Sequence, residues 1–287
     1  MQEKKRGRTH SRWLLPAALV LAGAAWFENF TLSTSTVTAA CAALPEAFSG
    51  LRIVQISDLH GRRFDAESRY LLELVRLQSP DLIALTGDLA DEFTDFSMLP
   101  PLLDGLTALA PTFYVTGNHE WVLSREKREA LFSMLDAAGV VRLQNEYRLL
   151  KKGQASIVLA GVDDPNGPYD QKRPAQLVRE IRQSRGRDAY ILMLSHRNDE
   201  LDLWANMGIQ TVLCGHGHGG IVRLPFVGAV FGTHLDLFPD YTAGLYQKGQ
   251  TSMIVSRGLG GSRELPLRIG NRPEIVTVIL KAESGKV

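Results

Sequence analysis

The chain has 287 residues, of which 45% are hydrophobic and 22% are charged, the composition of an ordinary globular protein with one large domain or two small ones. Its formal net charge is +1, so no strongly basic surface is expected and nucleic acid is not an expected partner. Two cysteines are too few for a disulfide framework.

The basic residues are concentrated at the N-terminus, ahead of an apolar stretch. Residues 1–12 form a basic tail, and residues 13–27 carry no charge. Extended through residue 30, the stretch approaches the roughly 20 residues that a membrane-spanning helix needs, with aromatic residues at both ends. We therefore expect a transmembrane or signal-anchor segment over residues 13–30. A cleaved signal peptide and a helix of the folded core are the alternatives.

The positive charge before this segment predicts the topology of the protein. Loops rich in Lys and Arg stay in the cytoplasm. The sequence thus predicts a protein anchored to the membrane by its N-terminus, with the following domain extracytoplasmic.

From residue 45 onward, apolar strands alternate with amphipathic helices. Residues 31–44 are rich in Thr, Ser and Ala and predict a linker or, alternatively, one edge strand. LRIVQIS, DLIALTG and PTFYVTG are typical of buried strands, whereas ESRYLLELVRLQ and SREKREALFSMLDAAG have apolar residues at helical spacing. Beyond Gly219 the chain is rich in strand-forming segments. This alternation predicts an α/β fold with a largely parallel first half, in one domain over residues 45–287.

Metal-ligating side chains follow these strands at the points where the strands end. They are Asp58, His60, Asp88, Asn118, His196, His216 and His218, with His119 beside them. Asp58-x-His60 and Gly87-Asp88 are weak signals alone, because Asp and His also cap turns, whereas GNHE and His216-Gly-His218 are moderately specific. Taken together they indicate one crevice, since ligands bind at the carboxyl ends of strands in open α/β sheets.

The expected ligands are nitrogen and oxygen atoms, without thiolate, which suits manganese, iron or zinc. Seven ligands exceed the needs of one four-coordinate ion, and one Asp can bridge two. A pair of ions would clamp a phosphoryl oxygen and generate a hydroxide nucleophile near neutral pH.

A glycine pattern in the same region resembles a dinucleotide fingerprint. Gly215, Gly217 and Gly220 have the G-x-G-x-x-G spacing, but the fingerprint must open a helix. The following IVRLP favours extended chain, so no nucleotide cofactor is expected.

Considered in order, DLH, GD, GNHE, the His of LSH and GHGH are similar to the signature blocks of the calcineurin-like metallophosphoesterases, over about residues 45–280. FSGLRIVQISDLHGR, GVDDPNG and SRGLGG resemble the membrane-associated branch, which includes phosphodiesterases and UDP-2,3-diacylglucosamine pyrophosphatases. The resemblance implies a four-layer αββα sandwich, an α/β (or α+β) fold in which helices flank two sheets.

The resemblance also implies roles for the residues that match its blocks. It assigns the seven ligands to two sites: Asp58, His60 and His218 to one, Asn118, His196 and His216 to the other, with Asp88 between them. His119 would be the catalytic residue that protonates the leaving oxygen or stabilises charge on the phosphate. Two positions depart from the pattern. Gly217 replaces a more usual Thr, and Arg197 after His196 is less usual and could contact a substrate phosphate.

We therefore expect a dinuclear phosphohydrolase that cleaves a phosphodiester or pyrophosphate bond by in-line attack of a metal-bound hydroxide. Two divalent ions are the expected cofactors, Mn²⁺ first and iron or zinc as alternatives. The expected substrate is a phosphorylated small molecule, or a lipid-linked one at the membrane surface. The alternatives are a metal-binding scaffold or sensor without turnover, and a nucleotide-directed phosphodiesterase or a phosphomonoesterase. Further candidates for phosphate contacts are Arg62, Arg63, Arg257 and Arg263.

Overall fold

The computed structural model describes residues 11–233, 235–261 and 268–283. Two six-stranded sheets and a two-stranded sheet account for its strands. In spatial order the first sheet consists of β1 (Ser33–Cys41), β14 (Glu274–Ala282), β2 (Arg52–Ile56), β3 (Leu82–Thr86), β4 (Thr112–Val115) and β5 (Val141–Arg142). The second consists of β12 (Gly244–Lys248), β13 (Thr251–Val255), β9 (Thr211–Cys214), β8 (Ile191–Leu194), β7 (Ala155–Gly161) and β6 (Glu146–Lys152). The small sheet is a hairpin of β10 (Val222–Leu224) and β11 (Gly228–Phe231).

The helices of the described chain include two short 3₁₀ segments. They are α1 (Ser11–Phe30), η1 (Glu46–Phe48), α2 (Arg69–Leu77), η2 (Phe96–Met98), α3 (Leu99–Leu109), α4 (Asn118–Val122), α5 (Arg125–Ala137), α6 (Pro174–Arg185) and α7 (Leu201–Asn206). As expected from the sequence, α2 ends before Pro80, and Gly139 follows α5 with a φ of 78°.

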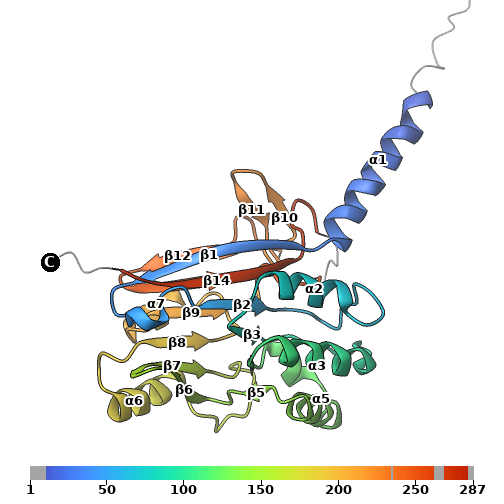
Figure 1. Cartoon of the computed structure of the whole chain (residues 1–287). Coiled ribbons are helices and arrows are strands. Elements are labelled where there is room, and N and C mark those ends of the chain that lie inside the picture. Colours follow the sequence, from blue (N-terminus) through green and yellow to red (C-terminus); the bar gives the residue numbers. More distant parts are fainter. Residues whose placement is uncertain (1–10, 234, 262–267, 284–287) are drawn as a thin grey trace, which may run out of the picture.

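The large sheets pack face to face, with helices on their outer faces (Figure 1). Three hydrophobic clusters fill the spaces between the four layers. Strand β2 shows how the sequence directs side chains to two of them. Val54 and Ile56 pack toward α2, α3 and α5, while Ile53 packs between the sheets, because successive strand residues point to opposite faces. On the far side, α6 and α7 cover the second sheet. The predicted αββα sandwich is confirmed.

The carboxyl ends of the central strands of both sheets lie close together. Strands β2, β3 and β4 are parallel in the first sheet, and β7, β8 and β9 are parallel in the second. A buried side chain ties the two sheets near these ends: Gln55 Nε2 donates to Thr86 Oγ1 at 3.0 Å and to Cys214 O at 2.8 Å. Loops leaving the two sheets can therefore contribute to one site.

The predictions for the N-terminal region need correction. No helix within residues 11–233, 235–261 and 268–283 is long and apolar enough to cross a membrane. The prediction of a spanning segment at residues 13–30 is therefore wrong, as are the membrane-anchored location and extracytoplasmic domain derived from it. The physical reason lies in α1, whose 20 residues include Arg12, Pro16 and Glu28 as well as five weakly apolar alanines. The basic tail predicted over residues 1–12 lies outside the described residues except for its last two positions.

The stretch predicted as a linker or an edge strand forms an edge strand. Within residues 31–44, β1 pairs in parallel with β14 along its whole length, from Ser33 with Glu274 to Cys41 with Ala282. The linker over residues 31–44 is therefore wrong, because the folded domain begins before residue 45.

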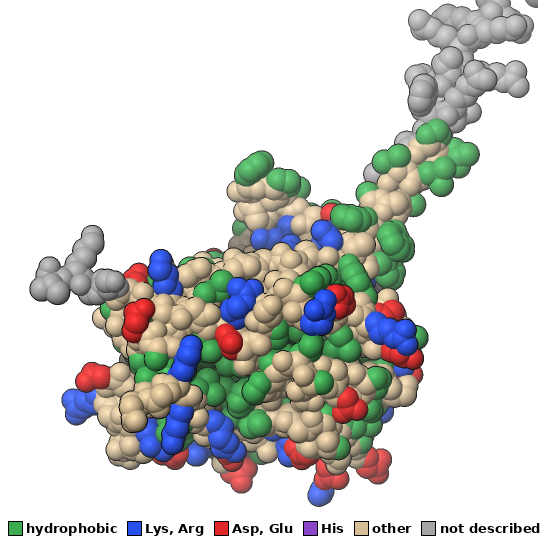
Figure 2. All heavy atoms as spheres, viewed as in Figure 1, with side chains coloured by type: hydrophobic (Ala, Val, Ile, Leu, Met, Phe, Trp, Pro, Cys, Tyr) green, Lys and Arg blue, Asp and Glu red, His purple; other side chains and the backbone are tan. Residues whose placement is uncertain are grey.

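The end of α1 is joined to this domain by a buried side chain. Asn29, which is 5% exposed, accepts a 2.8 Å hydrogen bond from the backbone N–H of Arg268 and donates to its carbonyl at 3.0 Å. Farther from the domain, α1 exposes apolar side chains that include Leu19 and Trp26 (Figure 2).

Candidate metal centre

The structure brings the predicted ligands together at the carboxyl ends of the central strands. Within the described chain, three groups of side chains offer donor atoms that all lie within 4.8 Å of one another. The groups are Asp58, His60 and His218; Asp88, His196 and His216; and His60, Asp88 and His119.

Five of these residues have an unusual backbone conformation. The φ values are 50° for Asp58, 48° for His60, 52° for Asp88, 66° for His216 and 50° for His218. Left-handed backbone is uncommon for residues other than glycine and costs on the order of 1 kcal/mol each. The surrounding fold therefore holds five side chains of this centre in place against local strain.

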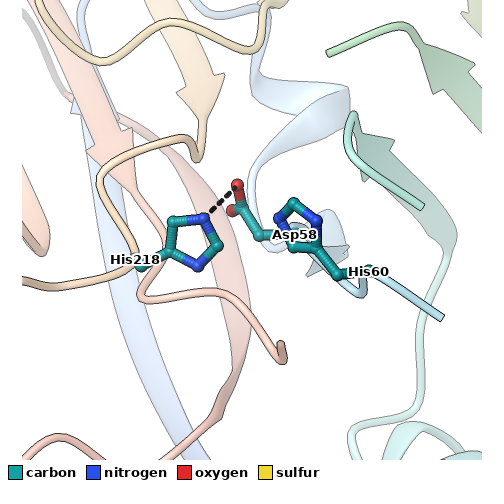
Figure 3. A group of neighbouring side chains, drawn as sticks. All are labelled: Asp58, His60 and His218. Atoms are coloured by element: carbon teal, nitrogen blue, oxygen red, sulfur yellow. Dashed lines mark ion pairs between the residues drawn. The ribbon is translucent and has the colours of Figure 1, made fainter. Parts of the chain in front are cut away.

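The first group joins the turn after β2 to the loop after β9 (Figure 3). His218 Nε2 lies 3.8 Å from Asp58 Oδ1, and the rings of His60 and His218 are stacked with centroids 5.0 Å apart. Two ring nitrogens here, His60 Nε2 and His218 Nδ1, are buried without a hydrogen-bond partner among the described residues. Unpartnered buried nitrogens beside carboxylates fit a metal site, because coordination satisfies them.

The second group surrounds the ring of His196. His196 Nε2 lies 3.2 Å from Asp88 Oδ2, 3.1 Å from Asn118 Oδ1 and 3.2 Å from His216 Nδ1. Its other nitrogen, Nδ1, is 2.9 Å from the carbonyl of Thr86, which orients the ring. Asn118 is thus placed with this group.

Asp88 lies between the two groups. Its Oδ2 is 3.2 Å from His196 Nε2 and 3.6 Å from His60 Nε2, and its side chain is 1% exposed. This arrangement allows one carboxylate to contact two neighbouring cations.

His119 is the second residue of α4 and lies beside the first group. Its backbone N–H donates to Asp88 Oδ1 at 2.9 Å, and its ring meets the His60 ring edge-on with centroids 4.7 Å apart. Burial lowers the pKa of His119, although the charge of Asp88 acts in the opposite direction.

Opposite charges dominate the electrostatics of the second group. Burial opposes ionisation, but the charge of His196 holds the pKa of Asp88 well below its usual range. Burial alone would lower the pKa of His196, but the charge of Asp88 raises it to about 10. A ligating imidazole is neutral, so a divalent cation bound here would take the place of the His196 proton as the positive charge beside Asp88.

Two glycines permit the close approach of loops at this centre. A Cβ on Gly117 would lie 2.2 Å from Asp88 Oδ1, and a Cβ on Gly215 would lie 1.9 Å from Ser57 Oγ and 2.3 Å from Asp58 Oδ2. Any side chain at either position would displace a carboxylate of the centre.

The sequence reasoning missed two carboxylates that support the centre. Glu120, which is fully buried, accepts hydrogen bonds from the backbone N–H groups of Asp88 at 3.0 Å and Gly117 at 2.7 Å. Asp91 Oδ2 lies 3.5 Å from His60 Nδ1 and orients that ring. Their positions in GNHE and in GDLAD were a signal, since carboxylates commonly orient ligating histidines.

The further arginines predicted to contact phosphate have other partners where the structure describes them. Arg62 stacks over the rings of Phe30 and Phe64, Arg63 pairs with Asp95 at 2.7 Å, and Arg257 pairs with Glu274 at 3.0 Å. Arg263 lies outside the described residues. These contacts give the three described arginines structural partners.

Comparisons with known proteins agree with this geometry. Residues 51–220 match the family model described as calcineurin-like phosphoesterase. The chain is 31% identical over 267 residues to the uncharacterized metallophosphoesterase YkuE of Bacillus subtilis, covering 90% of this chain and 89% of that protein. It is also 31% identical over 234 residues to phosphodiesterase YaeI of Escherichia coli, covering 80% and 82% of the two chains. An uncharacterized metallophosphoesterase of Aquifex aeolicus is 27% identical over 274 residues, covering 93% and 99%.

The pyrophosphatase branch suggested by the sequence stays a prediction, since none of these relatives carries that name. The broader assignment is established by the family model, which covers more than half of the chain, and by relatives along most of its length. The chain belongs to the calcineurin-like phosphoesterase family and is a hydrolase of phosphoric esters.

Proposed function

We propose that this protein is a dinuclear metal-dependent phosphohydrolase that cleaves a phosphodiester or pyrophosphate bond of a small phosphorylated substrate. The observation that carries the proposal is the position of Asp88, whose Oδ2 faces histidines of both groups at 3.2 and 3.6 Å. A carboxylate shared in this way is the natural bridge between two divalent ions.

The proposed ligand sets follow the two groups. Asp58, His60 and His218 would hold one ion, Asn118, His196 and His216 would hold the other, and Asp88 would be shared by both. Every donor is nitrogen or oxygen, which suits Mn²⁺ first and iron or zinc as alternatives. The unpartnered His60 Nε2 and His218 Nδ1 fit this role.

When bound, the two ions supply Lewis acidity and lower the pKa of a bound water. The protein contributes placement and proton transfer. His119 lies against His60 and Asp88, at the edge of both groups, where its ring can donate a proton to the departing oxygen. Glu120 keeps the loops that carry Asp88 and Asn118 in register by binding the backbone of both.

The proposal leaves out the lipid-linked substrate. That substrate was inferred from a membrane-spanning segment, and no described helix is suited to cross a membrane. A phosphodiester is supported by the relative named as a phosphodiesterase, whose sequence aligns with 80% of this chain.

The test measures metal content and hydrolysis together. Purified protein should bind two Mn²⁺ per chain and hydrolyse bis(p-nitrophenyl) phosphate. Asp88→Asn and His119→Ala should each lower kcat by at least about 100-fold, as expected for loss of a bridging ligand or a general acid. Asp202→Asn, which removes an exposed carboxylate paired with Lys248, is the matched control. Equal activity of Asp88→Asn and wild type would refute the mechanism, and a panel of nucleotides, monoesters and pyrophosphates would define the substrate.

A further inference from the structure

Arg197 is fixed beside the candidate metal centre by a buried carboxylate. Its Nε donates to Asp164 Oδ2 at 2.6 Å, and its Nη2 donates to Asp164 Oδ1 at 3.1 Å. The Asp164 side chain is fully buried, and that of Arg197 is 24% exposed. Two parallel hydrogen bonds hold the guanidinium plane in one orientation.

Asp164 is itself held in place by its neighbours. It follows β7, and Arg197 follows β8, the adjacent parallel strand. Its backbone N–H donates to Thr116 Oγ1 at 3.1 Å, and its Oδ1 accepts from the N–H of Asn166 at 2.9 Å. The turn that Asp164 begins thus also positions an arginine.

The remaining terminal nitrogen of Arg197 points at the metal centre. Nη1 lies 3.0 Å from His216 Nε2, in the group that also contains Asp88 and His196. A guanidinium has five N–H groups, and the contacts to Asp164 and His216 use three of them. Two donors are left for a ligand, on a side chain that is partly exposed.

We infer that Arg197 binds a non-bridging oxygen of the substrate phosphoryl group and that Asp164 is its positioning residue. The inference rests on the proposed function and adds a phosphate-binding side chain to it. Arginine is suited to this task because its planar donors match phosphate geometry and its charge is weakly hydrated. A cavity of about 330 Å³, lined in part by Asn198, His216 and Tyr241, opens beside His216, which Arg197 contacts, and has room for a substituent of the phosphate.

The matched control is a second Arg–Asp ion pair, which lies in another part of the fold. Arg142 pairs with Asp136 through Nε at 2.8 Å and Nη2 at 2.9 Å, and its side chain is 20% exposed. Its guanidinium stacks on Phe132, and Arg142 ends β5, the edge strand of the first sheet, whereas the candidate ligands follow the central strands. Arg142→Ala therefore removes an ion pair with the same two hydrogen bonds, whose Asp136 side chain is 55% exposed and which includes no candidate ligand.

The experiment compares Arg197→Ala, Arg197→Lys and Asp164→Asn with wild type and Arg142→Ala. Three quantities are measured: kcat/KM for bis(p-nitrophenyl) phosphate, the dissociation constant of inorganic phosphate by calorimetry, and the dissociation constant of Mn²⁺ by electron paramagnetic resonance. We expect Arg197→Ala to lower kcat/KM about 100-fold and to weaken phosphate binding at least about 10-fold. Mn²⁺ binding should change less than about threefold, and added guanidinium should restore part of the lost activity.

The two remaining variants separate phosphate binding from structural support. Arg197→Lys keeps the charge but not the paired donors, so it should recover only a small part of the loss. Asp164→Asn should lower kcat/KM about 10-fold, with little further loss when it is combined with Arg197→Ala, because both changes remove one positioned guanidinium.

The inference is overturned if Arg197→Ala binds phosphate as wild type does and loses only Mn²⁺ affinity, since Arg197 would then merely support His216. Failure of the proposed function looks different, because wild-type protein would then hydrolyse none of the substrates. In that case calorimetry with inorganic phosphate still decides whether Arg197 binds a phosphoryl oxygen.

Discussion

The backbone N–H of Asp88 donates a 3.0 Å hydrogen bond to Oε2 of Glu120, although the two residues are 32 positions apart in the chain. The same carboxylate accepts from Leu89 N at 2.7 Å and from Gly117 N at 2.7 Å. One buried side chain therefore joins the loop after β3 to the loop after β4, and these loops carry Asp88 and Asn118.

Replacing this carboxylate should destabilise the protein. Glu120→Gln puts an amide donor against backbone donors and leaves buried N–H groups without an acceptor. We expect the free energy of unfolding to fall by about 2–4 kcal/mol, measured by urea denaturation. The control Glu129→Gln, which removes an exposed partner of Arg125, should change it by less than about 0.5 kcal/mol. A similar effect of the two substitutions would show that Glu120 does not hold the loops together.

The carboxylate behind His60 should tune metal affinity. Asp91 Oδ2 lies 3.5 Å from His60 Nδ1, and Asp91 also accepts a 2.9 Å hydrogen bond from Thr94 Oγ1. Asp91→Asn should weaken Mn²⁺ binding about 10- to 100-fold, the usual effect of losing an orienting partner of a ligating histidine. Calorimetric titration with Mn²⁺ would measure this loss of affinity. An unchanged affinity would exclude an orienting role for Asp91.

Metal removal should lower stability, because buried ring nitrogens then lose their partners. With each site filled at about 100 times its Kd, binding stabilises the folded state by roughly 2.7 kcal/mol per site. Differential scanning calorimetry should show a lower Tm after chelation and its recovery with Mn²⁺. In Asp58→Asn the recovery should be about half as large, since Asp58 belongs to one group only. A Tm that is insensitive to chelation would argue against both sites.

Gly217 should be required for stability, because a side chain at this position would collide with Asn198. A Cβ at position 217 would lie 2.6 Å from Asn198 Nδ2, which donates to Tyr241 O at 2.8 Å. Gly217→Ala should cost about 1–3 kcal/mol of stability, as overpacking commonly does. In the Asn198→Ala background the same change should cost less than about 0.5 kcal/mol. Additive costs in the double-mutant cycle would show that the two residues do not compete for space.

Glu200 should make stability depend on pH. Burial, together with the charges of Asp199 and Asp164, raises its pKa from 4.5 to about 7. A raised carboxyl pKa means that the folded state prefers the protonated form, so stability is lost as pH rises from about 4.5 to about 7. Glu200→Gln removes this loss and should be up to about 2 kcal/mol more stable than wild type at pH 8, once solvent screening is allowed for. At pH 4 the two proteins should differ little, and a constant difference across pH would contradict this assignment.

The amino-acid sequence determined the elements and most of the candidate site. Apolar runs such as LRIVQIS have their hydrophobic residues on both faces, so they form strands buried between two layers wherever they pair. Because Asp58, Asp88 and His196 directly follow such runs, their place at strand ends is a local property of the chain.

The structure of the N-terminal region could not be predicted in the same way. Local composition made residues 31–44 look like a linker, but Ser33–Cys41 pairs with Glu274–Ala282, about 240 residues later in the chain. Strand pairing at such separation depends on the partner and not on the strand itself. The apolar content of residues 13–30 likewise suggested a membrane span that α1 does not provide.

Only the tertiary structure decided how the candidate ligands are supported. Glu120, Asp91 and Asp164 act on residues that come from other turns or strands. Their distances to Asp88, His60 and Arg197 follow from the pairing of neighbouring strands within each sheet, which brings the loops after those strands together. A carboxylate in a sequence has the same chemistry whether it is solvated or buried. Burial against a specific donor, which only packing creates, is what makes it part of the site.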